Sequence, residues 1–210
     1  MTHFRFLGTL ADVPLAGDPN AADIGLQMWR EACQSNADEI PRETFTSLAE
    51  WADAIADDAN GKRVLTAIFG NSPFLTSCAV REPALLCRLL TDGPDHTWAS
   101  LYENLTENLK QHLNDEQLSR ALRIAKRRVA LSIAIADICG VWPLEKITGG
   151  LSEFASTALS AATGHLLRAA SAQGAFRLTD INDPERGSGL VVLGMGKLGA
   201  GELNHSSDID

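Results

Sequence analysis

The sequence has few cysteines, and their arrangement excludes the usual cysteine-based sites. Cys33, Cys78, Cys87 and Cys139 never occur at Cys-x-x-Cys spacing, and no histidine stands at a metal-like interval from any of them. Disulfide frameworks are typical of small secreted domains, whereas this chain has 210 residues and is 45% hydrophobic. We therefore expect four free thiols that are buried in a core.

Long apolar runs are also absent. The longest apolar stretch, around residues 129–139, is interrupted by Ser132 and Asp137, whereas a membrane-spanning helix needs ~20 apolar residues in succession. Residues 1–8 lack the basic start, apolar run and small-residue cleavage site of a signal peptide. We expect a cytoplasmic protein that does not act in a membrane.

Positive charge is scarce in this sequence. The chain has 18 lysines and arginines against 27 aspartates and glutamates, which gives a net charge of -9. Because nucleic-acid binding needs a basic surface that contacts phosphates, this balance argues against a general nucleic-acid-binding protein. It is compatible with an enzyme that acts on nucleotides, in which metal ions neutralise carboxylates and substrate phosphates.

Apolar residues recur at helical spacing through most of residues 21–173. The clearest predicted helix covers residues 115–139, because Asn114 can cap its start and Gly140 follows its end. Residues 91–94 are expected to form a turn, and Ser152 can cap a helix that begins near residue 151. Further helices are expected over residues 21–35, 44–57, 62–69, 73–81, 83–90 and 151–172.

Five basic residues lie on the predicted helix 115–139, away from its apolar stripe. We favour a solvated surface for them, because charged runs on helices usually face water, and the alternative is a surface that receives an acidic partner or phosphates. These residues are Arg120, Arg123, Lys126, Arg127 and Arg128.

One histidine and the four tryptophans are interpreted as structural. His165 lies beside the apolar stripe of the helix predicted over residues 151–172, and its neighbours in sequence supply neither a second metal ligand nor a base. Trp29, Trp51, Trp98 and Trp142 are most simply core residues.

The pattern changes after Gly174. Residues 177–189 are polar, contain a proline and end in Gly-Ser-Gly, as expected of a linker. Residues 190–193 are a short β-branched apolar run that predicts a strand. The sequence therefore predicts a mainly α chain: a helical region over residues 1–176, the linker, and the first strand of a truncated α/β domain over residues 190–210.

The predicted strand leads directly into a glycine-rich turn that contains a lysine. Glycines let backbone amides come close to phosphates, because no Cβ intervenes and positive φ is allowed. Lys197 offers a mobile cation to the same phosphates. The candidate phosphate-binding residues of the turn are Gly194, Gly196, Lys197, Gly199 and Gly201.

Two aspartates follow the turn. Asp208 and Asp210 alternate around Ile209, so on an extended segment both carboxylates point to one face. Mg²⁺ prefers oxygen ligands and is often held by one or two carboxylates together with substrate phosphates. A glycine-rich turn, a lysine and an Asp-x-Asp triplet in this order predict a magnesium-dependent site for a nucleotide.

Dinucleotide binding is the rival interpretation, because residues 194–199 fit Gly-x-Gly-x-x-Gly after a strand. That fold needs a sizeable helix after the glycines, and Gly201 and Asn204 leave little room for one. It also uses a single acidic residue ~20 positions further on, whereas here two aspartates arrive sooner. A P-loop is excluded because Leu198 stands where Ser or Thr should follow Lys197.

Residues 193–210 (LGMGKLGAGELNHSSDID) resemble the signature of the bifunctional glutamine synthetase adenylyltransferase and adenylyl-removing enzymes, members of the DNA polymerase β-like nucleotidyltransferase superfamily. The specific elements are Gly-Met-Gly-Lys-Leu-Gly, Glu-Leu-Asn and Ser-Ser-Asp-Ile-Asp. Residues 70–75 and 122–125 are similar to that family's helical leader. The chain resembles the leader and the start of the first of the family's two catalytic units.

By this resemblance, Asp208 and Asp210 would be catalytic carboxylates that hold Mg²⁺. The glycine-rich turn, with Ser206 and Ser207, would face the phosphates of ATP or ADP. The family's first unit removes AMP from a modified tyrosine of glutamine synthetase by phosphorolysis, which gives ADP, and the second unit adds AMP from ATP. The superfamily site also requires a third carboxylate from a later strand, so we expect these 210 residues alone to be inactive.

The same resemblance implies glutamine synthetase as the partner, with a nitrogen-signalling regulatory protein as a further candidate. Two other functions stay open on the residues alone. Residues 21–173 can be a helical module that docks a protein partner, and the Gly-x-Gly-x-x-Gly run can belong to a nicotinamide-dependent oxidoreductase.

Overall fold

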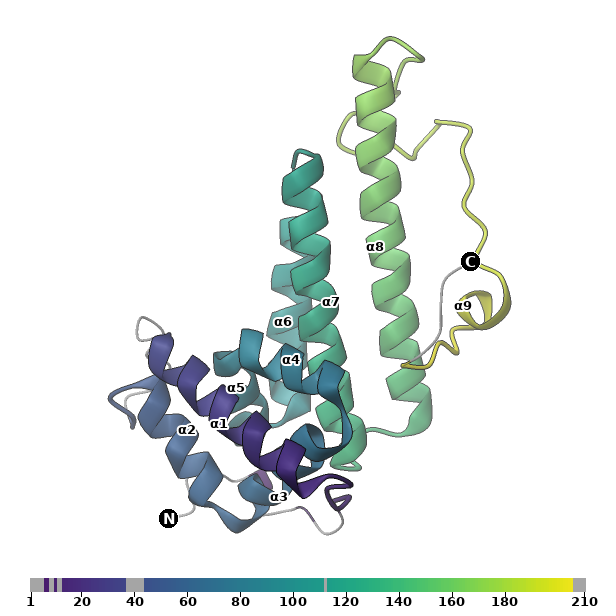
Figure 1. The fold of residues 1–210 in the computed structure, drawn as a ribbon. Coiled ribbons are helices and arrows are strands. Elements are labelled where there is room, and N and C mark those ends of the chain that lie inside the picture. Colours follow the sequence, from purple (N-terminus) through teal and green to yellow (C-terminus); the bar gives the residue numbers. More distant parts are fainter. Residues whose placement is uncertain (1–5, 8–9, 11–12, 37–43, 112, 206–210) are drawn as a thin grey trace. The chain divides into compact units, whose positions relative to one another are not determined.

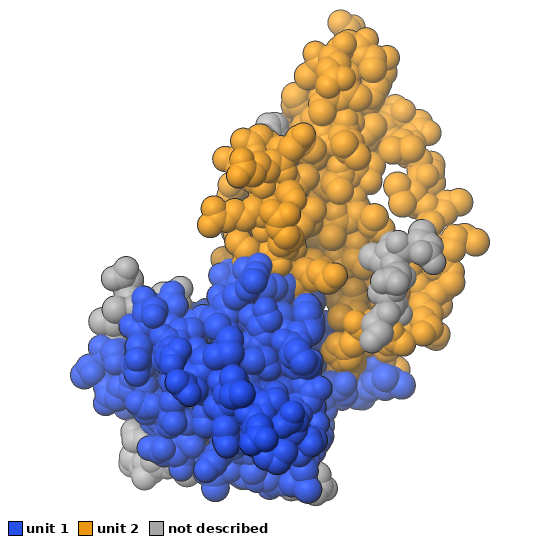
Figure 2. Space-filling view, in the orientation of Figure 1, with its two compact units in different colours: residues 1–101, 127–144 blue, residues 102–126, 145–210 orange. Residues whose placement is uncertain are grey.

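The computed structural model describes the chain except for residues 1–5, 8–9, 11–12, 37–43, 112 and 206–210. The chain forms two compact units, which Figure 2 colours separately: residues 1–101 with 127–144, and residues 102–126 with 145–210. Helices dominate the described residues, and none of these residues forms a strand (Figure 1). The mainly α class is therefore confirmed.

Short helices with very few connecting residues between most of them build the first unit. They are α1 (Pro19–Ser35), α2 (Leu48–Asp57), α3 (Ala59–Asn71), α4 (Pro73–Arg81) and α5 (Pro83–Asp92). Side chains that accept hydrogen bonds from the first backbone amides explain where α1 to α4 begin. These N-caps are Asp18, Ser47, Asp58 and Ser72.

The next two helices, α6 (Pro94–Lys110) and α7 (Asp115–Ile138), contribute residues to both units. The start of α7 is a capping box: the Asn114 side chain accepts from the Gln117 amide at 2.9 Å, and the Gln117 side chain accepts from the Asn114 amide at 3.0 Å. Gly140 follows its end with a φ of 63°. Both predicted ends of this helix are thus confirmed. The turn predicted over residues 91–94 is shorter, because Gly93 alone separates α5 from α6.

Aromatic side chains form part of the core of the first unit. Trp29 and Trp51 are fully buried, and Trp51 donates a hydrogen bond to the Thr91 hydroxyl at 3.0 Å, which satisfies its polar atom. Trp142 is also buried and meets the half-buried Trp98 edge to face, with ring centroids 5.3 Å apart. The prediction that the tryptophans are core residues is confirmed for the three buried ones.

The four cysteines are free thiols, as predicted. Cys33, Cys78 and Cys87 are buried, while Cys139 is only partly buried. Burial raises the pKa of Cys139 to about 12 and raises the pKa of Cys87 well above its ordinary value. These two thiols are therefore protonated at neutral pH and behave as small apolar side chains.

A buried carboxylate explains two of the five basic residues on α7. Glu82 is 7% exposed and accepts hydrogen bonds from Arg127 at 3.0 Å and from Arg128 at 2.7 Å, all within the first unit. The interpretation of the basic run as a solvated surface is thus wrong for Arg127, which is half-buried, whereas Arg128 stays exposed although it is paired. Their partner lies 45 and 46 positions earlier in the sequence, so no local pattern could reveal it.

The second unit is organised around α8 (Leu144–Ala172). Two side-chain contacts tie other segments to it: Tyr102 bonds the Thr157 hydroxyl at 2.8 Å, and the His165 Nε2 lies 2.6 Å from the Asp115 carboxylate. His165 therefore has a structural role, as expected, although its acidic partner comes from a segment 50 positions earlier in the sequence.

The predicted start of α8 near residue 151 is wrong. The helix begins at Leu144 and continues through Gly149 and Gly150, because each helical glycine costs only about 1 kcal/mol relative to alanine. Ser152 is consequently not a cap. It lies inside the helix, where its hydroxyl donates to the Thr148 carbonyl at 2.8 Å.

The strand predicted over residues 190–193 is not confirmed. This segment has no regular secondary structure, and its side chains are 52–76% exposed. A strand needs a neighbouring strand that completes its backbone hydrogen bonds, and no described segment of the chain supplies one. In the part of the chain that the structure describes, no helix is long and apolar enough to cross a membrane.

Candidate functional site

The glycine-rich turn follows the exposed segment in the second unit. Its centre is α9 (Gly196–Ala200), a helix of five residues. Gly201 ends this helix in the left-handed region with a φ of 72°, and Gly196 begins it with a φ of 53°. Residues with a side chain rarely adopt these backbone conformations, so both positions require glycine. As expected, the described residues contain no sizeable helix after the glycines, up to residue 205.

Two further glycines of the turn make a close backbone contact. A Cβ on Gly199 would lie 2.3 Å from the Gly194 carbonyl oxygen, so no side chain fits there. The turn also uses some of its own amides: that of Gly199 donates to the Met195 carbonyl at 3.2 Å, and that of Gly201 donates to the Leu198 carbonyl at 3.1 Å. The glycines thus build the turn itself.

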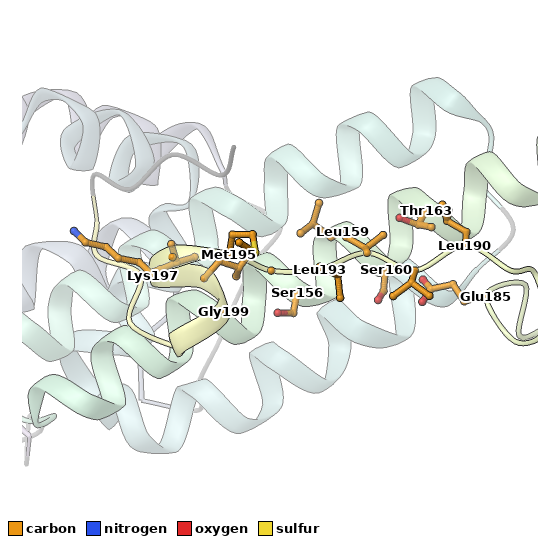
Figure 3. Close-up of a pocket in the computed structure, with 16 residues that line it drawn as sticks. Ser156, Leu159, Ser160, Thr163, Glu185, Leu190, Leu193, Met195, Lys197 and Gly199 are labelled. Carbon is orange, nitrogen blue, oxygen red and sulfur yellow. The ribbon is translucent and has the colours of Figure 1, made fainter.

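A cavity of about 1040 Å³ lies between α8 and the segment of residues 190–199, both of which belong to the second unit. Figure 3 shows Ser156 and Ser160 of α8 and Leu190 and Leu193 of the extended segment among the lining residues. Hydroxyl groups therefore come from the helix, whereas residues 190–193 supply half of the large apolar side chains in the lining. Lys197 is exposed and lies at one end of the lining, where its ammonium group is accessible to an anion (Figure 3).

The chain beyond the turn is fixed to α8 at Leu203. Its side chain is 5% exposed, and its amide donates a hydrogen bond to the Ser152 hydroxyl at 3.1 Å. The sequence analysis missed this contact. An apolar residue in a polar segment, Leu203 between Glu202 and Asn204, was the one available signal for it.

The structure thus brings together one part of the predicted site. Gly194, Gly196, Lys197, Gly199 and Gly201 form one turn beside α8. The two predicted metal ligands and two serines, Asp208, Asp210, Ser206 and Ser207, lie outside the described residues. Among the described residues, no group of three or more His, Cys, Asp or Glu side chains is placed to hold a metal ion.

Comparison with known proteins identifies one family. The sequence model of the family described as glutamate-ammonia ligase adenylyltransferase matches residues 62–210, which include the glycine-rich turn and both aspartates. No solved structure matches this chain.

Curated relatives carry the name bifunctional glutamine synthetase adenylyltransferase/adenylyl-removing enzyme. The chain is 39% identical to the protein of Rhizobium meliloti (strain 1021) over 201 residues, which cover 90% of this chain and 20% of the relative. It is 39% identical to the protein of Bradyrhizobium diazoefficiens over 181 residues, or 84% of this chain and 18% of the relative. The chain therefore spans about a fifth of the length of these relatives.

Proposed function

The chain belongs to the glutamate-ammonia ligase adenylyltransferase family, and from that premise we propose that it is the start of a nucleotidyltransferase unit that acts on glutamine synthetase. The observation that carries this proposal is the compact turn of residues 194–201, which precedes an Asp-x-Asp triplet by a few residues. Relatives with the same printed name share 35–39% identity with this chain, which supports the assignment.

The described residues fit a nucleotide phosphate. The turn has no side chains at its close backbone contact, and Lys197 is exposed beside it. Asp208 and Asp210 are a suitable donor set for Mg²⁺, which would neutralise the phosphate charge of ATP or ADP when bound. Ser206 and Ser207 would add hydroxyl donors to the same phosphates.

The finer proposal is that this unit removes AMP by phosphorolysis. An oxygen of inorganic phosphate attacks the phosphorus of the tyrosine-linked AMP, the bond from phosphorus to the tyrosine oxygen breaks, and ADP is released. The tyrosine oxygen takes a proton. The contribution of this chain would be to hold the phosphates with its turn and Lys197, while Asp208 and Asp210 would hold the Mg²⁺ that neutralises the phosphate charge.

Glutamine synthetase is the proposed partner, because it appears in the name of both relatives described above. A cytoplasmic location and a nitrogen-signalling regulatory partner belong to the same proposal. The oxidoreductase alternative is not favoured, since α9 has five residues and a dinucleotide-binding unit needs a longer helix after its glycines. Nothing in the described helices favours a pure docking module.

The test uses the complete protein that contains this segment. Adenylylated glutamine synthetase is incubated with phosphate and Mg²⁺, and the release of ADP is measured for the wild type and for Asp208→Asn and Asp210→Asn. We expect each substitution to lower kcat at least a hundredfold, because loss of a metal ligand removes transition-state charge stabilisation. The matched control is Asp183→Asn, an exposed linker residue. Full activity of both site variants would refute the proposal.

A further inference from the structure

The chain just after the glycine-rich turn has one buried point of attachment. The buried Ser152 hydroxyl donates to the Thr148 carbonyl at 2.8 Å and accepts a hydrogen bond from the Leu203 amide at 3.1 Å. Leu203 is 5% exposed, whereas Glu202 and Asn204 on either side of it are exposed. The Leu203 backbone and side chain are therefore both fixed against α8.

The chain before the extended segment has a second point of attachment. Pro184 is buried although its neighbours in the linker are exposed. Its Cγ lies 3.1 Å from the position that a Cβ would take on Gly164, a buried residue of α8. Because this distance is shorter than ordinary van der Waals contact, the missing side chain of Gly164 makes the room that Pro184 occupies.

The segment between these two attachments has no buried residue of its own. Residues 185–202, all of which the structure describes, are exposed or half-buried. They include the extended residues 190–193 and the whole glycine-rich turn. Ser152 and Gly164 are separated by about 18 Å along α8, given a rise of about 1.5 Å per residue. The position of the turn along the helix is therefore set by its two ends.

We propose that Ser152 and Gly164 are positioning residues for the candidate site, and that α8 is the rigid support that fixes both ends of the segment carrying the turn. Ser152 holds the chain five residues before Asp208. The catalytic consequence rests on the proposed function, because it acts through the turn and the two aspartates. Small displacements of positioning groups are costly, since a shift of about 1 Å can lower a rate about a hundredfold.

Hydrogen exchange tests the attachment itself, without any measurement of activity. In the complete protein, the amide of Leu203 should exchange about three- to tenfold faster in Ser152→Ala than in the wild type, the range expected for the loss of one hydrogen bond. Ser152→Thr keeps the acceptor oxygen and should restore slow exchange.

The matched control for exchange is Ser156→Ala. Its hydroxyl makes the same kind of bond within α8, to the Ser152 carbonyl at 3.0 Å, and its loss should leave Leu203 protected. Equal exchange at Leu203 in Ser152→Ala and the wild type would overturn the inference.

Kinetics then test the positioning role. Ser152→Ala should lower kcat for AMP removal about three- to tenfold and leave the KM for adenylylated glutamine synthetase unchanged, with recovery in Ser152→Thr. Gly164→Val should also lower kcat, because its side chain displaces Pro184. Faster exchange at Leu203 with an unchanged kcat would overturn the positioning role while the proposed function stands. Full activity of the Asp208→Asn and Asp210→Asn variants would instead refute the proposed function and leave the exchange result intact.

Discussion

Replacing Glu82 by alanine should destabilise the first unit substantially. The carboxylate is 7% exposed and receives one charged hydrogen bond from each of two arginines. Bonds to charged groups contribute about 1.5–3 kcal/mol each when buried. Arg127 and Arg128 are 24% and 47% exposed, so solvent screens them and rehydrates them after the substitution. We therefore expect a total loss of about 2–3 kcal/mol in the free energy of unfolding.

The measurement is urea-induced unfolding followed by circular dichroism. Glu82→Gln keeps the shape of the side chain and one acceptor oxygen, so its free energy of unfolding should fall by about half as much as that of Glu82→Ala. In thermal unfolding the alanine variant should melt about 4–12 °C lower, at 2–4 °C per kcal/mol. Glu31→Ala is the control, because Glu31 is an exposed acidic residue of α1, and it should stay within about 0.5 kcal/mol of the wild type. The reasoning would be refuted if the free energy of unfolding of Glu82→Ala also stayed within about 0.5 kcal/mol of the wild-type value.

Three further predictions concern glycines, thiols and the exposed segment. Gly61→Ala should lower the free energy of unfolding in urea by about 1–3 kcal/mol, because its Cβ would lie 2.1 Å from the Ile55 carbonyl oxygen. Gly149→Ala, whose Cβ would have no atom within 4 Å, should raise it by up to about 1 kcal/mol, and equal effects of the two substitutions would contradict this. Burial raises the pKa of Cys139 to about 12, so its contribution to stability is complete below the ordinary thiol pKa of about 9 and is lost as the pH rises towards 12. The urea midpoint should therefore fall less between pH 8 and pH 10.5 in Cys139→Ser than in the wild type, and an equal fall would count against the burial. Val192 is 55% exposed in the apolar segment of residues 190–193, so the 210-residue chain should self-associate in sedimentation experiments, and Val192→Lys should weaken this association. Identical sedimentation of the variant and the wild type would show that the segment is not responsible.

Local chemistry allowed most helices to be predicted from the sequence. The cap at Asn114 and the glycine at position 140 indicated both ends of α7, since these signals act within one turn of the helix. The predicted start of α8 was wrong because Ser152 was interpreted as a cap, whereas the helix runs through Gly149 and Gly150, whose cost in a helix is modest.

Features that depend on distant residues could not be predicted in this way. A strand over residues 190–193 requires a pairing partner, and the β-branched pattern says nothing about whether one is present. The ion cluster of Glu82 and the attachment of Leu203 to Ser152 join residues 45–51 positions apart. The glycine-rich turn was predictable because its geometry is encoded in adjacent glycines.

The fate of inorganic phosphate tests the central claim most directly. The complete protein is incubated with adenylylated glutamine synthetase, Mg²⁺ and labelled phosphate, and the nucleotide products are separated. The proposed phosphorolysis predicts that the label appears in ADP, and that this incorporation is lost when Asp208 and Asp210 are both changed to asparagine. Label that stays in free phosphate while AMP is released, or incorporation that survives the double substitution, would contradict the account.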